Sequence, residues 1–188
     1  KWQGRKYCVF VNSGSSANLL LLQTLKNVGM LKTRDKIGLS ALTWATNAMP
    51  VLQLGFEPVL LDVSMETLNV PPGNLVSDIK ALFITHLLGL CDDMVTIQKY
   101  CEDRNIILLE DTCESLGSEM GGGKLGNFGF ASTFSFFVAH HLSTIEGGMV
   151  VTDNDLFANA LLMTRAHGWA RNIPETPRLR LQKNFGIG

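Results

Sequence analysis

Strongly apolar runs alternate with segments of helical periodicity along almost the whole chain. The strand-like runs are rich in β-branched and aromatic residues and read "YCVFV", "KIGLSA", "PVLLDV", "ALFITHL", "IILLED", "ASTFSFF" and "GMVVT". Several of them are apolar on both faces, which is typical of parallel strands covered from both sides. The alternation predicts an α/β fold with a mostly parallel sheet and helices on both faces. In such a sheet, ligands bind at the carboxyl ends of the strands.

Four segments between these runs have apolar residues at helical spacing. They read "SANLLLLQTLKNVGML", "WATNAMPVLQLG", "MVTIQKYCEDRN" and "NDLFANALLMTRAHG". We expect Ser15 or Ser16 to cap the first helix, and Pro50 to lie near the first turn of the second or to kink it. Gly168 is the expected C-cap of the last helix. "NVPPGN" and "NIPETPR" are predicted loops. Because the chain opens almost directly into a strand and stops at "QKNFGIG" without a closing element, we expect a fragment of a longer protein.

Composition excludes several classes of protein. The 188 residues are 46% hydrophobic and 18% charged, which is ordinary for one globular domain. A net charge of −1 gives no broad basic field for nucleic acid or a membrane surface. No apolar run approaches the ~20 residues that span a bilayer, and the first residues lack a signal peptide. The four cysteines are scattered without a C-x-x-C pair, so we expect mostly buried, reduced thiols in a cytoplasmic protein, with no disulfide and no zinc site.

The stretch "VNSGSSANLL" runs from a strand into a helix through a serine-rich turn. Gly14 lets the backbone approach a ligand closely, and the free amides and hydroxyls around Ser15 suit a phosphate group. A turn of this kind is also a common helix N-cap. From these residues alone, a phosphate site and a simple helix cap are about equally well supported.

The stretch "IILLEDTCES" ends a very apolar strand with two acids, Glu110 and Asp111. Successive strand residues point to opposite faces, so one carboxylate is expected at the ligand-binding edge of the sheet. An acid at that edge binds a cation, a metal or a protonated ring nitrogen, and the alternative is a cap for the next turn.

The stretch "FSFFVAHHLSTIEGG" places His140 and His141 side by side between a strand and a glycine pair. The two histidines could serve packing, metal binding or base catalysis. A metal site is disfavoured because no further ligands stand nearby at a usable spacing. His86, which follows "ALFIT", is expected to be a packed histidine at the end of its strand.

These motifs resemble, in content and order, those of the DegT/DnrJ/EryC1/StrS family of sugar aminotransferases. The order is "NSG", an aromatic residue in "TWAT", "ED" with an acid three residues on, then the serine of "FSFF" and "EGG", and the resemblance runs from Lys6 to about Arg171. It implies the pyridoxal-phosphate fold type I of aspartate aminotransferase. Residues 1–188 would then be the cofactor-binding large domain, with an N-terminal segment and a C-terminal small domain outside the fragment.

The sequence departs from the family at one decisive position. Family aminotransferases carry a lysine five residues after the serine of "SFxxxK", and counting from Ser135 this position is His140. Histidine has no amine to bind the cofactor aldehyde, but it can act as a base near neutral pH. The substitution resembles a branch of the family, the 4-keto-6-deoxyhexose 3-dehydratases, and "RAHGWARNIP" is similar to that branch too.

The resemblance implies a reaction and its partners. Pyridoxamine phosphate would act on a nucleotide-linked 4-keto-6-deoxy sugar, with His140 as base, giving a 4-keto-3,6-dideoxy sugar for lipopolysaccharide O-antigen. Glutamate is the expected amino donor, and a homodimer is expected.

The resemblance also implies roles for individual side chains. Asp111 would pair with the pyridine nitrogen, Trp44 would stack on the ring, and Glu114 would lie near the phenolic oxygen. The phosphate would be held by Gly14, Ser15 and Ser135. His167 and Arg171 would receive an anionic group of the donor or substrate, with a solvated helix end as the alternative. His141 is expected to be orienting or structural.

Three rival functions are weighed against the dehydratase. An aminotransferase without its lysine is disfavoured by the chemistry. A CDP-sugar 3-dehydrase of the same family needs an iron–sulfur cluster, whereas no cysteine follows Cys113 in this chain. A non-catalytic cofactor-binding protein is disfavoured because Asp111, Trp44 and Ser135 are retained.

Overall fold

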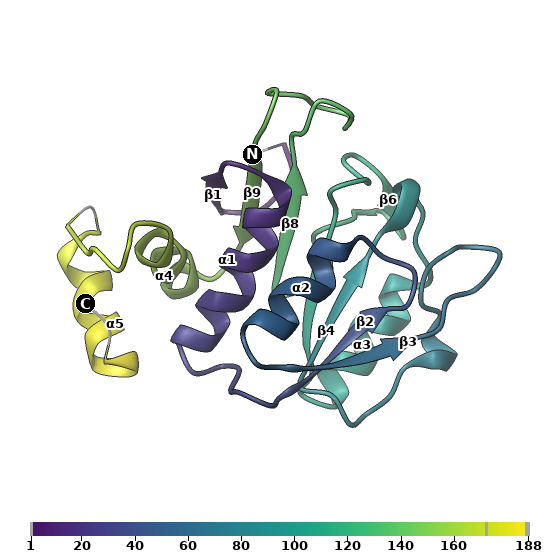
Figure 1. Cartoon of the computed structure of the whole chain (residues 1–188), viewed down its shortest axis with the longest axis horizontal. Coiled ribbons are helices and arrows are strands. Elements are labelled where there is room, and N and C mark those ends of the chain that lie inside the picture. Colours follow the sequence, from purple (N-terminus) through teal and green to yellow (C-terminus); the bar gives the residue numbers. More distant parts are fainter. Residues whose placement is uncertain (1, 172, 187–188) are drawn as a thin grey trace.

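A seven-stranded, mostly parallel sheet forms the centre of the computed structural model, which describes residues 2–171 and 173–186 (Figure 1). The strands run in the order β1-β9-β8-β5-β4-β2-β3. Their bounds are β1 Tyr7–Val11, β2 Lys36–Ser40, β3 Glu57–Leu61, β4 Ala81–Thr85, β5 Ile107–Asp111, β8 Ala131–Ser135 and β9 Gly148–Thr152. β9 is antiparallel to β8 and to β1, and the other pairings are parallel. Each of the seven predicted strands is confirmed.

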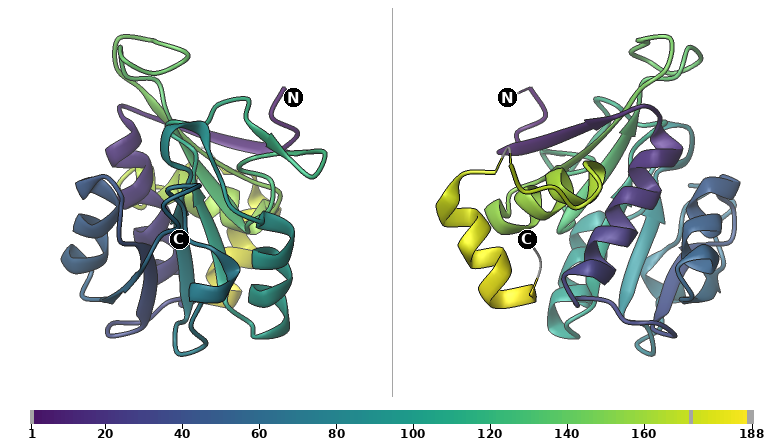
Figure 2. Two further views of the ribbon diagram at one scale, coloured as in Figure 1. Left: turned by 90° about the vertical axis from the view of Figure 1, so that its right-hand side faces the viewer. Right: turned by 60° about the vertical axis from the view of Figure 1, so that its left-hand side comes forward.

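Helices cover both faces of the sheet, as predicted (Figure 2). One face carries α1 (Gly14–Asn27), α2 (Ala45–Gln53) and α4 (Asp155–Arg165), with α5 (Glu175–Phe185) packed against α4. The other face carries α3 (Met94–Asp103). Short 3-10 turns η1 (Pro72–Asn74) and η2 (Leu87–Gly89) and a hairpin of β6 (Glu119–Met120) and β7 (Gly123–Lys124) complete the described chain.

Strand β4 shows why the apolar runs lack polar alternation. Phe83 is buried among the residues of α1 and α4, whereas Leu82 and Ile84 are buried in the second core with Met94 of α3. All five residues of the strand are buried. A strand with a core on each side needs an apolar residue at every position.

The cap predictions for α1 and α4 are wrong by one position or more. Ser13, rather than Ser15 or Ser16, is the N-cap of α1, and its side-chain oxygen accepts a hydrogen bond from Ser16 N at 3.1 Å. At the end of α4 both His167 (φ 62°) and Gly168 (φ 83°) have positive φ, and the N–H of Gly168 donates to Met163 O at 2.8 Å. This is a Schellman ending with histidine in the position that glycine usually takes.

Pro50 lies in the second turn of α2, not in its first, and it shapes the site. It has no N–H to donate to the carbonyl of Thr46, four residues earlier. The Asn18 side chain of α1 donates to that carbonyl instead, at 3.3 Å. The proline therefore couples α2 to α1 beside the carboxyl end of β5.

The chain after residue 173 contains a helix that the sequence did not indicate. α5 begins inside the predicted loop "NIPETPR", so the loop prediction is wrong for residues 175–178. Leu181 is the only buried side chain of this helix among the described residues. A helix with a single buried apolar residue has almost no periodic signal. The expectation of no closing element is therefore wrong for residues 175–185.

The glycine pair of "EGG" is explained by close packing at the start of β9. A Cβ on Gly148 would lie 2.1 Å from Ser13 O, and one on Gly147 would lie 2.6 Å from the Thr144 hydroxyl. The missing side chains allow the turn before α1 to lie directly on β9.

We expect Gly148→Ala to destabilise the protein by about 3 kcal/mol, because the backbone of Ser13 must move. Gly73→Ala is the matched control, since nothing lies within 4 Å of its added Cβ, and it should change the free energy of unfolding little. Urea unfolding of both variants measures the difference. Equal free energies of unfolding for the two variants would show that the close contact between residue 148 and Ser13 does not restrict the side chain at this position.

Candidate active site

A cavity of about 700 Å³ opens at the carboxyl ends of the parallel strands. Its walls come from the turn before α1, the start of α2, and the segments that follow β4, β5 and β8. It is lined by eight of the residues singled out in the sequence: Gly14, Ser15, Trp44, Asp111, Glu114, Ser135, His140 and His141.

Asp111 is the acid at the floor of this cavity and is 4% exposed. Its Oδ2 accepts hydrogen bonds from Asn18 Nδ2 at 2.9 Å and Asn47 Nδ2 at 2.7 Å. Its Oδ1 accepts one from Cys113 N at 2.9 Å. A carboxylate has about four acceptor positions, so one remains for a donor that enters from the cavity.

The beginning of α1 forms another wall. A Cβ on Gly14 would lie 2.7 Å from Ser135 Cβ and 3.0 Å from Cys113 Sγ. The glycine therefore allows the helix to start directly against the end of β8. First-turn amides have no partner inside a helix, and the helix dipole is positive there, so this corner favours an anion.

His140 and His141 lie on the segment between β8 and β9, which projects beyond the sheet (Figures 1 and 2). His140 is half-buried, and its N–H donates to Phe137 O at 2.9 Å. The rings of His140 and Phe137 meet edge to face at an interplanar angle of 72°, with their centroids 6.0 Å apart. Both histidines line the cavity, but His141 is the more exposed. Among the described residues that line the cavity there is no lysine.

Glu114 and Trp44 form the rim. Trp44 is 68% exposed, which is unusual for so large an aromatic side chain. Glu114 Oε2 accepts a hydrogen bond from Leu88 N at 2.8 Å and so holds the η2 turn against the cavity.

Comparison with known proteins identifies the family. The model of the DegT/DnrJ/EryC1/StrS aminotransferase family matches residues 1–187. The chain belongs to this family.

Several family members are similar over nearly the whole chain. GDP-4-keto-6-deoxy-D-mannose 3-dehydratase of Yersinia pseudotuberculosis is 40% identical over 97% of the chain and 48% of its own length. The structure of the Escherichia coli enzyme with bound hydrated PLP superimposes with a TM-score of 0.87, at 40% identity, over 92% of this chain and 46% of that one. Another, with a trapped PLP-glutamate geminal diamine, has a TM-score of 0.88 at 39% identity, over 92% of this chain and 46% of that one. The chain spans about half the length of the curated relatives it matches.

The DegT/DnrJ/EryC1/StrS assignment confirms the expected fold type I architecture. Within the described residues, no helix has the length and apolar character to cross a membrane. No group of three metal-ligating side chains gathers in the described part of the chain. The four cysteines are free thiols, although only Cys101 is fully buried and Cys8 is exposed, so the expectation of mostly buried thiols is wrong.

Two residues expected at the substrate do not belong to the lining of this cavity. His167 and Arg171 are not among the residues that line the cavity. Both flank Trp169 beyond α4, with Arg171 stacked over its ring at 4.5 Å. Their role toward an anionic group stays a prediction.

The sequence reading missed three contributors to the site. Asn18 and Asn47 are buried in helices α1 and α2, and each leaves its side-chain oxygen without a partner in the described chain. The signal in the sequence was an asparagine on the apolar face of each helix, because a buried polar side chain needs a partner.

The third missed contributor is Cys113. Burial, followed by the charge of Asp111, raises the pKa of its thiol well above the usual value, so this thiol stays protonated.

Proposed function

We propose that the protein is a pyridoxamine-phosphate-dependent 3-dehydratase of a nucleotide-linked 4-keto-6-deoxyhexose. The observation that carries this proposal is a cavity that combines a buried aspartate with a histidine pair and, among its described lining residues, no lysine. An aminotransferase needs the lysine amine, whereas a dehydratase needs only a base at this position.

The residues present fit the cofactor. Asp111 keeps an acceptor position toward the cavity, where it can pair with a protonated pyridine nitrogen. Gly14, Ser15 and Ser135 surround the corner that favours a phosphate. Trp44 offers an exposed aromatic face for the ring at the cavity rim, and Glu114, which lines the same cavity, would face the phenolic oxygen.

The chain's own residues divide the remaining work. When bound, the cofactor supplies an amine for the C4 ketone and a ring that withdraws electrons, so that the C3 hydroxyl can leave. Asp111 would pair with the protonated ring nitrogen, and His140 would accept the proton of the cofactor's C4′ carbon at one of its imidazole nitrogens. An imidazole has no primary amine and cannot form an imine with the cofactor, but its ring nitrogen can accept a proton.

The partners follow from the same proposal. The names of the relatives support a GDP-linked sugar substrate, and the PLP-glutamate adduct supports glutamate as amino donor. We also propose a cytoplasmic homodimer that works in dideoxysugar biosynthesis.

The test is to incubate the protein with pyridoxamine phosphate, glutamate and GDP- or CDP-4-keto-6-deoxy sugars. A 4-keto-3,6-dideoxy sugar, with the nitrogen released as ammonia, is the expected outcome. A stable 4-amino sugar would instead identify an aminotransferase, and binding without turnover would identify a non-catalytic protein.

We further expect that borohydride will leave no cofactor covalently attached to the protein after incubation with pyridoxal phosphate. The reason is that the cavity presents histidine and no lysine among its described lining residues. Mass spectrometry of the reduced, denatured protein measures the adduct. A stoichiometric adduct on any lysine would contradict the proposed role of His140.

A further inference from the structure

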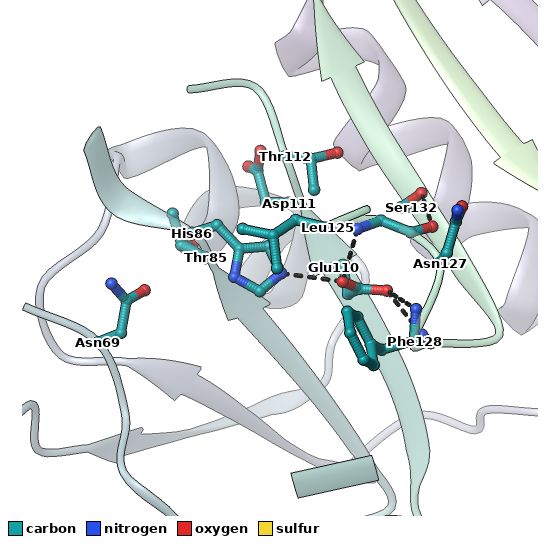
Figure 3. A network of polar contacts seen from close by, with 12 residues as sticks. Asn69, Thr85, His86, Glu110, Asp111, Thr112, Leu125, Asn127, Phe128 and Ser132 are labelled. Atoms are coloured by element: carbon teal, nitrogen blue, oxygen red, sulfur yellow. Dashed lines mark hydrogen bonds and ion pairs between the residues drawn. The ribbon is translucent and has the colours of Figure 1, made fainter. Parts of the chain in front are cut away.

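A fully buried histidine–glutamate pair lies beside Asp111 (Figure 3). His86 follows β4 and Glu110 belongs to β5, and both side chains are 0% exposed. Nε2 of His86 lies 2.9 Å from Glu110 Oε2. The histidine is therefore packed at its strand end, as expected, but it also has a charged partner.

Glu110 accepts hydrogen bonds on both oxygens. Oε2 accepts from Gly126 N at 2.7 Å, and Oε1 accepts from Phe128 N at 2.8 Å and Gly129 N at 2.6 Å. Burial would raise the pKa of Glu110, but the bond and charge of His86 and the backbone donors outweigh it, so this pKa is lowered. Because the ionised carboxylate has no proton to give, His86 is the donor of their shared hydrogen bond.

The pair holds the position from which Asp111 reaches the cavity. Glu110 and Asp111 are consecutive on β5, so their side chains point to opposite faces of the sheet. The carboxylate of Glu110 fixes one face of this strand end to the loop 126–129. At the same strand end, the backbone N–H of His86 donates to the backbone carbonyl of Asp111 at 3.0 Å. The backbone of Asp111 is thus held by the residue before it and by the strand beside it.

The pair also supports a strained turn of the cavity wall. Leu87 and Leu88 follow His86 and line the cavity. Leu88 has a φ of 54°, an uncommon conformation for a residue other than glycine. The turn is held by Glu114 at Leu88 N, by Asn69 Oδ1 at Leu87 N at 3.3 Å, and by His86 at its start.

We propose that His86 and Glu110 are positioning residues, which set the carboxylate of Asp111 and the Leu87–Gly89 turn against the bound cofactor. This inference rests on the proposed function, because it assigns Asp111 to the pyridine nitrogen. Neither residue lines the cavity, so both act through residues that do.

Three substitutions separate the parts of this network. Glu110→Gln places an amide NH₂ against backbone or histidine donors, because both carboxylate oxygens already accept. His86→Leu removes the side-chain donor but leaves the three loop bonds of Glu110 in place. His86→Gln restores an N–H close to the position of Nε2 and should rescue part of the loss.

Arg5→Gln is the matched control. Arg5 Nε donates to Gly126 O at 3.0 Å and Nη2 donates to Gly129 O at 2.5 Å, so the arginine holds the same loop from the other side. Its third hydrogen bond goes to Asp153, away from Asp111. If Glu110 only stabilises the loop, the Arg5 and Glu110 variants should behave alike.

The experiment measures the Kd and the absorption spectrum of pyridoxal phosphate bound to each purified variant, with Tm as a separate record of stability. We expect Glu110→Gln and His86→Leu to raise the Kd about tenfold, as for one lost hydrogen bond to a charged group, and to shift the cofactor band. His86→Gln should lie between His86→Leu and the wild type, and Arg5→Gln should lower Tm with little change in Kd.

The outcomes distinguish this inference from the function on which it rests. If the wild type binds the cofactor and Asp111→Ala weakens it, but His86→Leu and Glu110→Gln bind normally, the positioning role is wrong and the proposed function stands. If Arg5→Gln and His86→Leu lose equal affinity for the cofactor, the positioning role is also wrong, because the loss then reflects lower stability in general. If Glu110→Gln does not fold, the comparison of His86→Leu with His86→Gln decides. Failure of the wild type to bind any cofactor would overturn both proposals.

Discussion

His140→Asn is expected to abolish formation of the 3-deoxy product while the protein still binds its cofactor. An amide cannot take up a proton near neutral pH, and loss of a positioned base lowers the rate by about 10²–10⁴-fold. His140 is half-buried and lies outside the strands, on the segment between β8 and β9, so the substitution should not disturb the core. Product formation and the cofactor spectrum are measured together.

Two further variants make this prediction specific to one histidine of the pair. His141→Asn is the matched control and should have a milder effect, since its spacing from Ser135 is one residue too long and its side chain is more exposed. His140→Lys should form a covalent link to the cofactor and suppress loss of the C3 hydroxyl, because a lysine can also return the proton to the sugar carbon. If His141→Asn abolishes dehydration and His140→Asn does not, the roles of the two histidines are reversed.

The fold could be predicted from the sequence because burial on two faces leaves a strong local pattern. All seven apolar runs became strands, since runs such as residues 81–85 have a core on each side. The helix α5 was missed for the converse reason, because one buried leucine creates no periodicity. The caps at Ser13 and His167 were missed because several neighbouring residues have side chains or conformations suited to a cap. Which of them caps the helix depends on the packing of the helix end against the rest of the fold.

The candidate site was predictable only in part. Asp111 is predictable as the last residue of an apolar strand, and His140 as the residue at the lysine position of the family. Both line the cavity. The partners of Asp111 come from α1 and α2, 93 and 64 residues away in sequence, and no local pattern places Asn18 or Asn47 beside it. Nor could the sequence indicate that Glu110 points away from the cavity toward His86, because the choice of face depends on the register of β5.

Asp111→Ala should lower turnover by about 100-fold or more, because the site loses the charge that stabilises a protonated pyridine ring. The buried carboxylate accepts hydrogen bonds from Asn18, Asn47 and Cys113 N, and these donors lose their partner in the variant. Such losses cost about 1–3 kcal/mol each when the donors remain unsatisfied. The alanine leaves space beside the cavity in which water can replace the carboxylate, so we expect a lower Tm but a folded protein.

Asp111→Asn separates charge from packing. The amide fills nearly the same volume and keeps one oxygen for Asn18 and Asn47, although its NH₂ then faces the N–H of Cys113. Because two of the three hydrogen bonds are kept, its Tm should lie above that of Asp111→Ala, while its turnover should be about as low. Asp103→Ala, on the exposed end of α3, is the control for removal of a surface carboxylate and should match the wild type. Turnover and the absorption band of bound cofactor are compared across the three variants. An Asp111→Ala protein with most of its activity and an unchanged cofactor spectrum would show that another group pairs with the ring nitrogen.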